Sequence, residues 1–180
     1  MINTTQQYDK VITTCQEIFT RKMNDYGAAW RITRPASITD LIYIKALRVR
    51  AIEKKGVMKI NEGVKPELVG IINYAIMGII QIENDDSVKL EPDKIIELYK
   101  ARATDARNLM LDKNHDYDEA WRVMRPSSIT DMILMKILRV KQIEDNHGAT
   151  TISEGIPANY LDIINYAAFA IIRLEEKNIH

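Results

Sequence analysis

The chain contains an internal repeat in which nearly the same stretch of sequence occurs twice. The segment "DYGAAWRITRPASITD" occupies residues 25–40, and "DYDEAWRVMRPSSITD" occupies residues 116–131. When residues 25–54 are aligned with residues 116–145, at an offset of 91, 18 of the 30 positions are identical. A duplication of this extent constrains the fold more than any other feature, because each copy must form the same local structure.

The match continues towards the end of each copy. One inserted residue moves the offset to 92, and "IINYA" then recurs at 71–75 and 163–167. We therefore predict two homologous units and a short polar linker, which together form one compact domain: 1–84, 85–91 and 92–180.

Each unit is predicted to contain three helices. In the first unit we expect helices over 4–24, from Ser37 to about Lys55, and from Pro66 to Glu83. The pattern Ser37-x-x-Asp40, repeated as Ser128-x-x-Asp131, resembles a capping box at the start of the second helix. Few windows favour a strand, and the best candidate is 57–60.

The third helix of each unit is apolar on nearly all sides. The segments "ELVGIINYAIMGII" and "YLDIINYAAFAII" leave little polar surface, and such a helix must be enclosed. The simplest enclosure is for each unit to cover the other, like a homodimer fused into one chain. We therefore predict an all-α fold in which two tandem three-helix repeats pack as a pseudo-two-fold bundle.

Composition excludes several classes of function. Lys and Arg number 25, as do Asp and Glu, so no basic excess favours direct binding of nucleic acid. No apolar run reaches the roughly 18 residues needed to cross a membrane. The single cysteine, Cys15, cannot form an internal disulfide, which favours a cytoplasmic location. The three histidines do not cluster, so they indicate neither a metal site nor histidine-based catalysis.

Cations stand within the apolar stripe of the second helix. Lys45 lies inside the arc of apolar side chains and Arg48 lies at its edge, and the second copy repeats this with Lys136 and Arg139. A buried lysine needs a carboxylate partner or a bound anion. The two interpretations are a structural ion pair and a phosphate-binding pair in the groove between the units.

The third helix carries the complementary polar stripe. In the second copy it consists of Asn159, Asp162, Asn165 and Tyr166; in the first, of Glu67, Gly70, Asn73 and Tyr74. Carboxylates one helical turn apart suit Mg²⁺. Each copy keeps one half of such a pair, and the nearby Glu62 and Glu154 could contribute. The alternative is that the asparagines only form hydrogen bonds inside the core.

The loop after the first helix is polar and aromatic in both copies. Trp30 and Trp121, with the arginines that follow each of them, could stack on a base and hold a phosphate. A tryptophan at a junction of helix and loop is more often a packing anchor.

Three segments together resemble a known family. "KMNDYGAAW", "IKALRV" and "EGVKPELVGIINYAIMGIIQIE" are similar to the nucleotide-modification-associated domain of phages and bacteria. That family resembles the all-α nucleoside triphosphate pyrophosphohydrolases of the MazG and dimeric dUTPase type. The resemblance implies a MazG-like fold, acidic residues that bind Mg²⁺ and activate water, and cleavage between the α- and β-phosphates.

The family pattern can be placed on this chain residue by residue. Its Lys and Arg fall on Lys45 and Arg48, and on Lys136 and Arg139. Its acidic positions fall on Glu62 and Glu154, and on Asp162 in the second copy only. The other acidic positions of the pattern are occupied by uncharged residues: Ile44, Pro66, Gly70, Met135 and Ala158.

Three hypotheses follow. The first is a Mg²⁺-dependent pyrophosphohydrolase with a partly degenerate acidic site, in which Glu62, Glu154 and Asp162 are catalytic and Glu67, Asp162 and Glu154 bind the metal. The second is a module that binds a nucleotide or another phosphate-bearing small molecule without chemistry; in both, the substrate is held by Lys45, Arg48, Lys136, Arg139, Asn73, Asn165, Tyr74 and Tyr166. The third is a structural or interaction bundle whose buried polar residues are structural. The sequence leaves open a homodimer of the whole chain.

Overall fold

The chain folds into six α-helices in a computed structural model that describes residues 3–55 and 63–177. The helices are α1 (Thr4–Tyr26), α2 (Pro35–Lys55), α3 (Val64–Glu83), α4 (Pro92–Tyr117), α5 (Pro126–Asp145) and α6 (Ile156–Lys177). Two short 3-10 turns, η1 (Ala29–Ile32) and η2 (Ala120–Val123), follow α1 and α4. The predicted all-α class is confirmed. The strand candidate at 57–60 lies outside the described residues.

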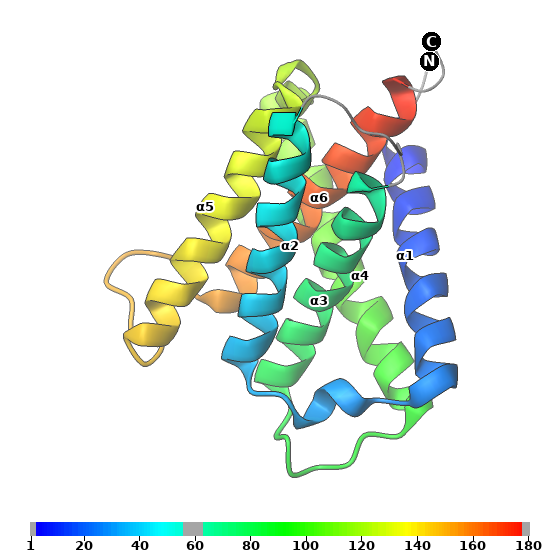
Figure 1. Cartoon of the computed structure of the whole chain (residues 1–180), viewed down its shortest axis with the longest axis vertical. Coiled ribbons are helices and arrows are strands. Elements are labelled where there is room, and N and C mark those ends of the chain that lie inside the picture. Colours follow the sequence, from blue (N-terminus) through cyan, green and yellow to red (C-terminus); the bar gives the residue numbers. More distant parts are fainter. Residues whose placement is uncertain (1–2, 56–62, 178–180) are drawn as a thin grey trace.

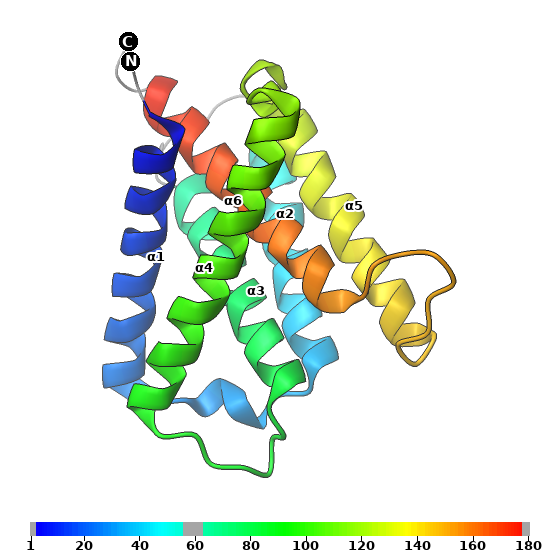
Figure 2. The same cartoon turned by 180° about the vertical axis from the view of Figure 1, so that it is seen from behind.

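The two repeats run in opposite directions along the bundle (Figure 1). Helices α1 and α3 descend in this view while α4 and α6 ascend, and α2 and α5 are likewise reversed relative to each other. Within a repeat, α2 packs on α3 and α5 packs on α6; between repeats, α3 packs on α6 and α2 packs on α5. The reverse view shows α1 and α4 covering the other side of α3 and α6 (Figure 2). The apolar third helices are therefore enclosed as the sequence predicted.

The helix ends agree with the sequence at α1 but not at α2. Gly27 ends α1 with a positive φ of 65°, and its N–H donates to the carbonyl oxygen of Met23. A positive φ at the end of a helix suits glycine, which has no Cβ to clash. The predicted capping box at Ser37 and Asp40 is wrong, because α2 begins at Pro35 and Ser37 lies inside its first turn. Proline is favoured at the first position of a helix, because the N–H that it lacks would have no partner within the helix there.

Buried hydrogen bonds join the repeats reciprocally. The hydroxyl of Tyr8 on α1 donates to Asn165 Oδ1 on α6 at 2.7 Å, and the hydroxyl of Tyr99 on α4 donates to Asn73 Oδ1 on α3 at the same distance. Tyr8 corresponds to Tyr99, and Asn73 corresponds to Asn165. Each repeat thus inserts its first helix against the third helix of the other, as expected for a pseudo-two-fold arrangement.

A second reciprocal set lies between α2 and α5. Thr39 Oγ1 donates to Glu144 at 2.6 Å, and its counterpart Thr130 donates to Glu53 at 2.7 Å. Two ion pairs flank these bonds with the same symmetry: Arg50–Asp131 and Lys141–Asp40. The acidic residues assigned to the capping box therefore pair across the repeat interface.

None of the described helices has both the length and the apolar character required to span a bilayer. The cytoplasmic location stays a prediction. Several apolar side chains on the outer surface of α2 and α5 are more than a third exposed: Ile44, Leu47, Met135 and Leu138.

Candidate functional site

Both predicted buried lysines have a carboxylate partner on the third helix of their own repeat. Lys45 Nζ lies 3.2 Å from Glu67 Oε2, and Arg48 lies 2.9 Å from the other oxygen of the same carboxylate. Lys136 Nζ lies 2.6 Å from Asp162 Oδ2. The two lysine side chains are only 28% and 14% exposed. Ion pairing is what makes such burial tolerable.

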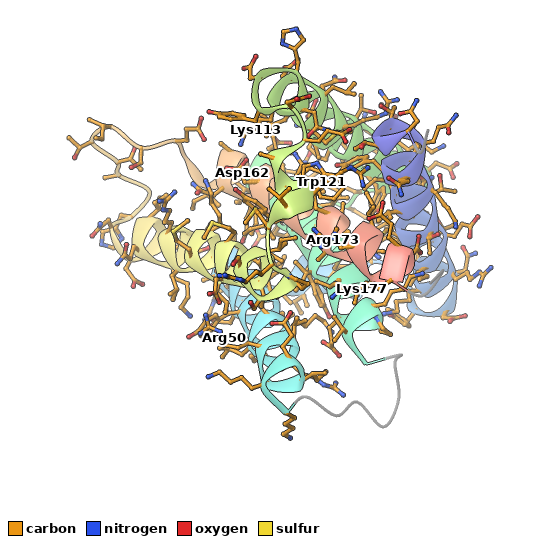
Figure 3. All side chains as sticks on the ribbon, turned by 90° about the horizontal axis from the view of Figure 1, so that it is seen from above. Arg50, Lys113, Trp121, Asp162, Arg173 and Lys177 are labelled. Atoms are coloured by element: carbon orange, nitrogen blue, oxygen red, sulfur yellow. The ribbon has the colours of Figure 1, made fainter. Side chains whose placement is uncertain are left out.

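The second repeat adds a cation to its pair. Lys113, at the end of α4, lies 2.5 Å from Asp162 Oδ1, so two lysines hold the two oxygens of one carboxylate. Figure 3 shows Asp162 on α6 close to the end of α4 that carries Lys113. The Asp162 side chain is 5% exposed, and both its oxygens are satisfied.

The carboxylate that pairs with the lysine of the second helix occupies different positions in the two repeats, one helical turn apart along the third helix. Glu67 corresponds to Asn159, and Asp162 corresponds to Gly70. A Cβ atom at position 70 would lie 2.8 Å from Lys45 Cε, which is too close. The Lys45 side chain therefore passes over Gly70, through space that the Asp162 side chain fills in the second repeat.

A pocket opens beside Gly70 in the first repeat. It has a volume of about 880 Å³ and lies between α1, η1, α2 and α3. Aromatic and apolar side chains line most of it, namely Ile18, Phe19, Met23, Tyr26, Trp30, Leu41, Val69, Tyr74 and Met77. Three lysines, Lys22, Lys45 and Lys65, supply the positive charge, and Asn73 is also in the wall.

In the second repeat, larger or charged side chains stand at the equivalent positions. Asp162 takes the place of Gly70 and binds the counterparts of Lys22 and Lys45. Trp121 stacks on Phe169 with ring centroids 4.3 Å apart and an interplanar angle of 3°. Phe169 corresponds to Met77, and Trp121 is buried as a packing anchor. The two repeats therefore share a backbone fold but differ in the side chains that line this space.

The lysines of the open pocket are not equally neutralised. Lys65 pairs with Glu175 on α6 at 2.7 Å, and Lys45 shares Glu67 with Arg48. Lys22 is exposed, and no carboxylate of residues 3–55 or 63–177 lies within ion-pair distance of it. The pocket therefore carries an excess of positive charge at the edge of an apolar wall.

The asparagines and tyrosines predicted to bind substrate, two on α3 and two on α6, divide into two groups. The buried Asn73 and Asn165 accept the tyrosine hydrogen bonds that join the repeats, and Asn73 Nδ2 also donates to the carbonyl oxygen of Cys15. Tyr74 lines the pocket, with its ring 5.8 Å from Lys45 Nζ. Tyr166 is half-buried, and burial together with the Asp162 charge raises its pKa.

The arginines beside the tryptophans serve the framework. Arg31 donates to the Gln81 side chain at 2.6 Å and to the carbonyl oxygen of Asp85. Arg122 donates to Glu119 and Glu176, both at 2.7 Å. These contacts fasten the short turns η1 and η2 to the ends of the bundle.

The described carboxylates do not fit a magnesium site. Over residues 3–55 and 63–177, no three acidic, histidine or cysteine side chains gather around a common point. Glu67 and Asp162 are each neutralised by two cations, which removes the negative charge that Mg²⁺ requires. Glu154 is exposed, and Glu62 lies outside the described residues. The magnesium site stays a prediction.

A second, more polar pocket lies in the second repeat. It has a volume of about 640 Å³ between α5 and the loop before α6. Lys136, Arg139, Glu154 and Asn159 line it, together with loop residues 149–153. The structure therefore brings together four residues of the predicted site or polar stripe here, but the wall provides no aromatic ring.

A family model supplies the decisive comparison. The model described as nucleotide modification associated domain 1 matches twice, at residues 22–82 and 113–174. The chain belongs to this family. The two matches confirm the internal duplication and cover most of each repeat. Comparison with curated proteins and with solved structures finds no significant match. The family description concerns nucleotides, and it specifies neither a reaction nor a metal.

Sequence reasoning missed three features of the open pocket: the cations Lys22 and Lys65, and the space beside Gly70. Lys22 recurs as Lys113, and this repeat was the available signal. The exchange of glycine for aspartate between Gly70 and Asp162 was also visible, but only as the loss of an acid. The structural effect of this exchange depends on where the Lys45 and Lys136 side chains lie.

Proposed function

We propose that the chain binds a nucleotide in the open pocket of the first repeat, without hydrolysing it. The observation that carries the proposal is the combination of an aromatic wall with uncompensated lysine charge in one pocket. A nucleotide requires both, because its base is an aromatic ring and its phosphates are anions. Membership of a family described as nucleotide modification associated is compatible with the same ligand class.

The pocket suits a ligand of this size. Its volume of about 880 Å³ is within the usual range for small-molecule sites, which extends from about 300 to about 1000 Å³. Tyr26, Trp30 and Tyr74 offer ring faces or edges to a base. Stacking of a base on an aromatic side chain contributes about 1–3 kcal/mol. Lys22 and Lys45 stand at the polar side of the wall, where they could hold a phosphate.

Binding without chemistry is favoured over hydrolysis. Metal-dependent hydrolysis of a phosphate bond needs a bound metal ion that activates water and neutralises the leaving group. The described carboxylates that would hold that metal, Glu67 and Asp162, are already occupied by lysine and arginine. A purely structural bundle is the competing hypothesis, and it is favoured by the internal partners of Asn73 and Asn165.

The duplicated sequence provides a matched control for the test. Tyr26 lines the pocket and is 62% exposed, while its counterpart Tyr117 is 70% exposed on the other repeat. Either tyrosine can be replaced by alanine with little cost to folding. Calorimetric titration with ribo- and deoxyribonucleoside mono- and triphosphates, with and without Mg²⁺, measures binding, and release of phosphate or pyrophosphate measures hydrolysis.

The expected result is binding of at least one nucleotide with a stoichiometry near one. Tyr26→Ala should weaken this binding by about fivefold or more, which corresponds to the loss of roughly 1 kcal/mol of stacking. Tyr117→Ala should leave it unchanged. No heat of binding across the whole panel would favour the structural hypothesis, and Mg²⁺-dependent turnover would favour the hydrolase.

A further inference from the structure

In the second repeat an internal carboxylate lies between two lysines whose counterparts line the open pocket of the first. In the second repeat, the Asp162 carboxylate lies between Lys113 and Lys136, 2.5 and 2.6 Å from their ammonium groups. The counterparts of these lysines in the first repeat are Lys22 and Lys45. Both line the open pocket, and Gly70 replaces the aspartate between them.

We infer that Asp162 is a built-in substitute for the ligand, and that a phosphate group of the nucleotide lies between the ammonium groups of Lys22 and Lys45. This assignment rests on the proposed function and gives the ligand an orientation. The phosphate occupies the side of the pocket next to Gly70, and the base extends towards Tyr26 and Trp30. The second repeat would then be a copy of the same site whose anion is supplied by its own chain.

The charges around the position support an anion. In the second repeat Lys113 and Lys136 share one internal carboxylate, that of Asp162. In the first repeat the single carboxylate is Glu67, one turn earlier on α3, and it pairs with Lys45 and Arg48 instead. Lys22 has no carboxylate partner among the described residues. An incoming phosphate would pair with Lys22, as Asp162 pairs with Lys113.

The glycine leaves room for the present path of the Lys45 side chain. Lys45 Cε lies 2.8 Å from where a Cβ at position 70 would be, so a side chain there requires the flexible end of Lys45 to move aside. An aspartate at this position would bring its own carboxylate to both lysines, as Asp162 does. The variant Gly70→Asp should therefore occupy the anion position of the first repeat without disturbing the aromatic wall.

The first experiment compares a nucleotide with its own nucleoside by calorimetric titration. Lys22→Gln and Gly70→Asp should each weaken nucleotide binding by about tenfold or more, since each removes or occupies a charge contact with phosphate. Binding of the nucleoside should change by less than about twofold. Lys10→Gln is the control, because Lys10 lies on the same helix, is 75% exposed and does not line the pocket.

The second experiment uses the other repeat and needs no nucleotide. Asp162→Gly should leave an anion-sized space between Lys113 and Lys136, and acetate has the composition of the deleted side chain. Acetate or inorganic phosphate should raise the Tm of Asp162→Gly by several degrees, by binding the folded state. The same salts should stabilise Asp162→Asn no more than the wild type, because its amide still fills the space.

The outcomes separate this assignment from the proposed function. If the wild type binds a nucleotide but Lys22→Gln and Gly70→Asp bind it equally well, the phosphate position is wrong and the proposed function stands. If acetate and phosphate stabilise Asp162→Gly no more than Asp162→Asn, the equivalence of carboxylate and ligand is overturned. A wild-type chain that binds no nucleotide contradicts the proposed function and the assignment together.

Discussion

Tyr8 Oη on the first helix of one repeat donates a 2.7 Å hydrogen bond to Asn165 Oδ1 on the third helix of the other. Both groups are buried, and burial raises the pKa of the tyrosine far above its usual range. The counterpart bond from Tyr99 to Asn73 has the same length. Each repeat therefore buries a tyrosine hydroxyl against the third helix of the other repeat. These two bonds fix how the repeats pack on each other.

We expect removal of either bond to destabilise the whole chain. Tyr8→Phe and Tyr99→Phe each leave a buried asparagine oxygen without its donor, at a cost of about 1–3 kcal/mol in the free energy of unfolding. Urea unfolding measures this cost. Tyr117→Phe is the control, since its side chain is 70% exposed. Equal stability of all three variants would contradict a structural role for the bonds.

The carboxylates between α2 and α5 should make stability depend on pH. Burial raises the pKa of Glu53 and of Glu144, although each accepts a hydrogen bond from a threonine. A raised folded-state pKa gives a contribution that is complete below the unfolded value of roughly 4.3 and is lost as the pH rises through the folded value. Arg50 and Lys141 offset part of this loss.

The double variant Glu53→Gln/Glu144→Gln removes the charges but keeps an acceptor for each threonine. It should gain stability relative to the wild type as the pH rises from 4 to 8, and thermal unfolding across this range measures the difference. A difference that stays constant with pH, or that falls as the pH rises, would contradict the burial of these carboxylates.

The start of α2 separates the two interpretations of its serine. A capping box would make Ser37→Ala and Ser128→Ala cost about 1 kcal/mol each. Ser37 instead lies inside the helix that begins at Pro35. We therefore expect changes within about 0.5 kcal/mol. Chemical denaturation of the two variants distinguishes these values, and a loss of about 1 kcal/mol in both would restore the capping box.

Removal of the carboxylate charge should destabilise the two ion-pair clusters by different amounts. Asp162→Asn leaves Lys113 and Lys136 without their shared carboxylate. Breaking a buried pair costs about 3–5 kcal/mol. Glu67→Gln should cost less, because its partner Arg48 is 65% exposed and can turn to solvent. The denaturation midpoints of the two variants test this order, and the reverse order would contradict the interpretation of the second repeat as the closed site.

Much of the fold could be predicted from the sequence, because repeats and apolar periodicity are local signals. The duplication required two similar units, and the apolar third helices required mutual cover. The pairing of Asp40 with Lys141 could not be predicted, because a carboxylate three residues after a serine matches a capping box equally well until the partner helix is in place.

The candidate site was predicted less completely. Lys45 and Lys136 stood out as cations in an apolar stripe, and both proved to form partly buried ion pairs. The difference between the repeats was not accessible, because it depends on how the Lys45 side chain lies over Gly70 and how Asp162 meets Lys113. Such contacts between helices leave no periodic trace in a sequence.

A crystal structure of the chain with a bound nucleoside monophosphate tests the account most directly. It should show the phosphate between Lys22 and Lys45 and the base against Tyr26 or Trp30, with Asp162 still between Lys113 and Lys136 in the second repeat. A nucleotide bound instead in the polar pocket between α5 and the loop before α6, with the first-repeat pocket empty, would contradict it.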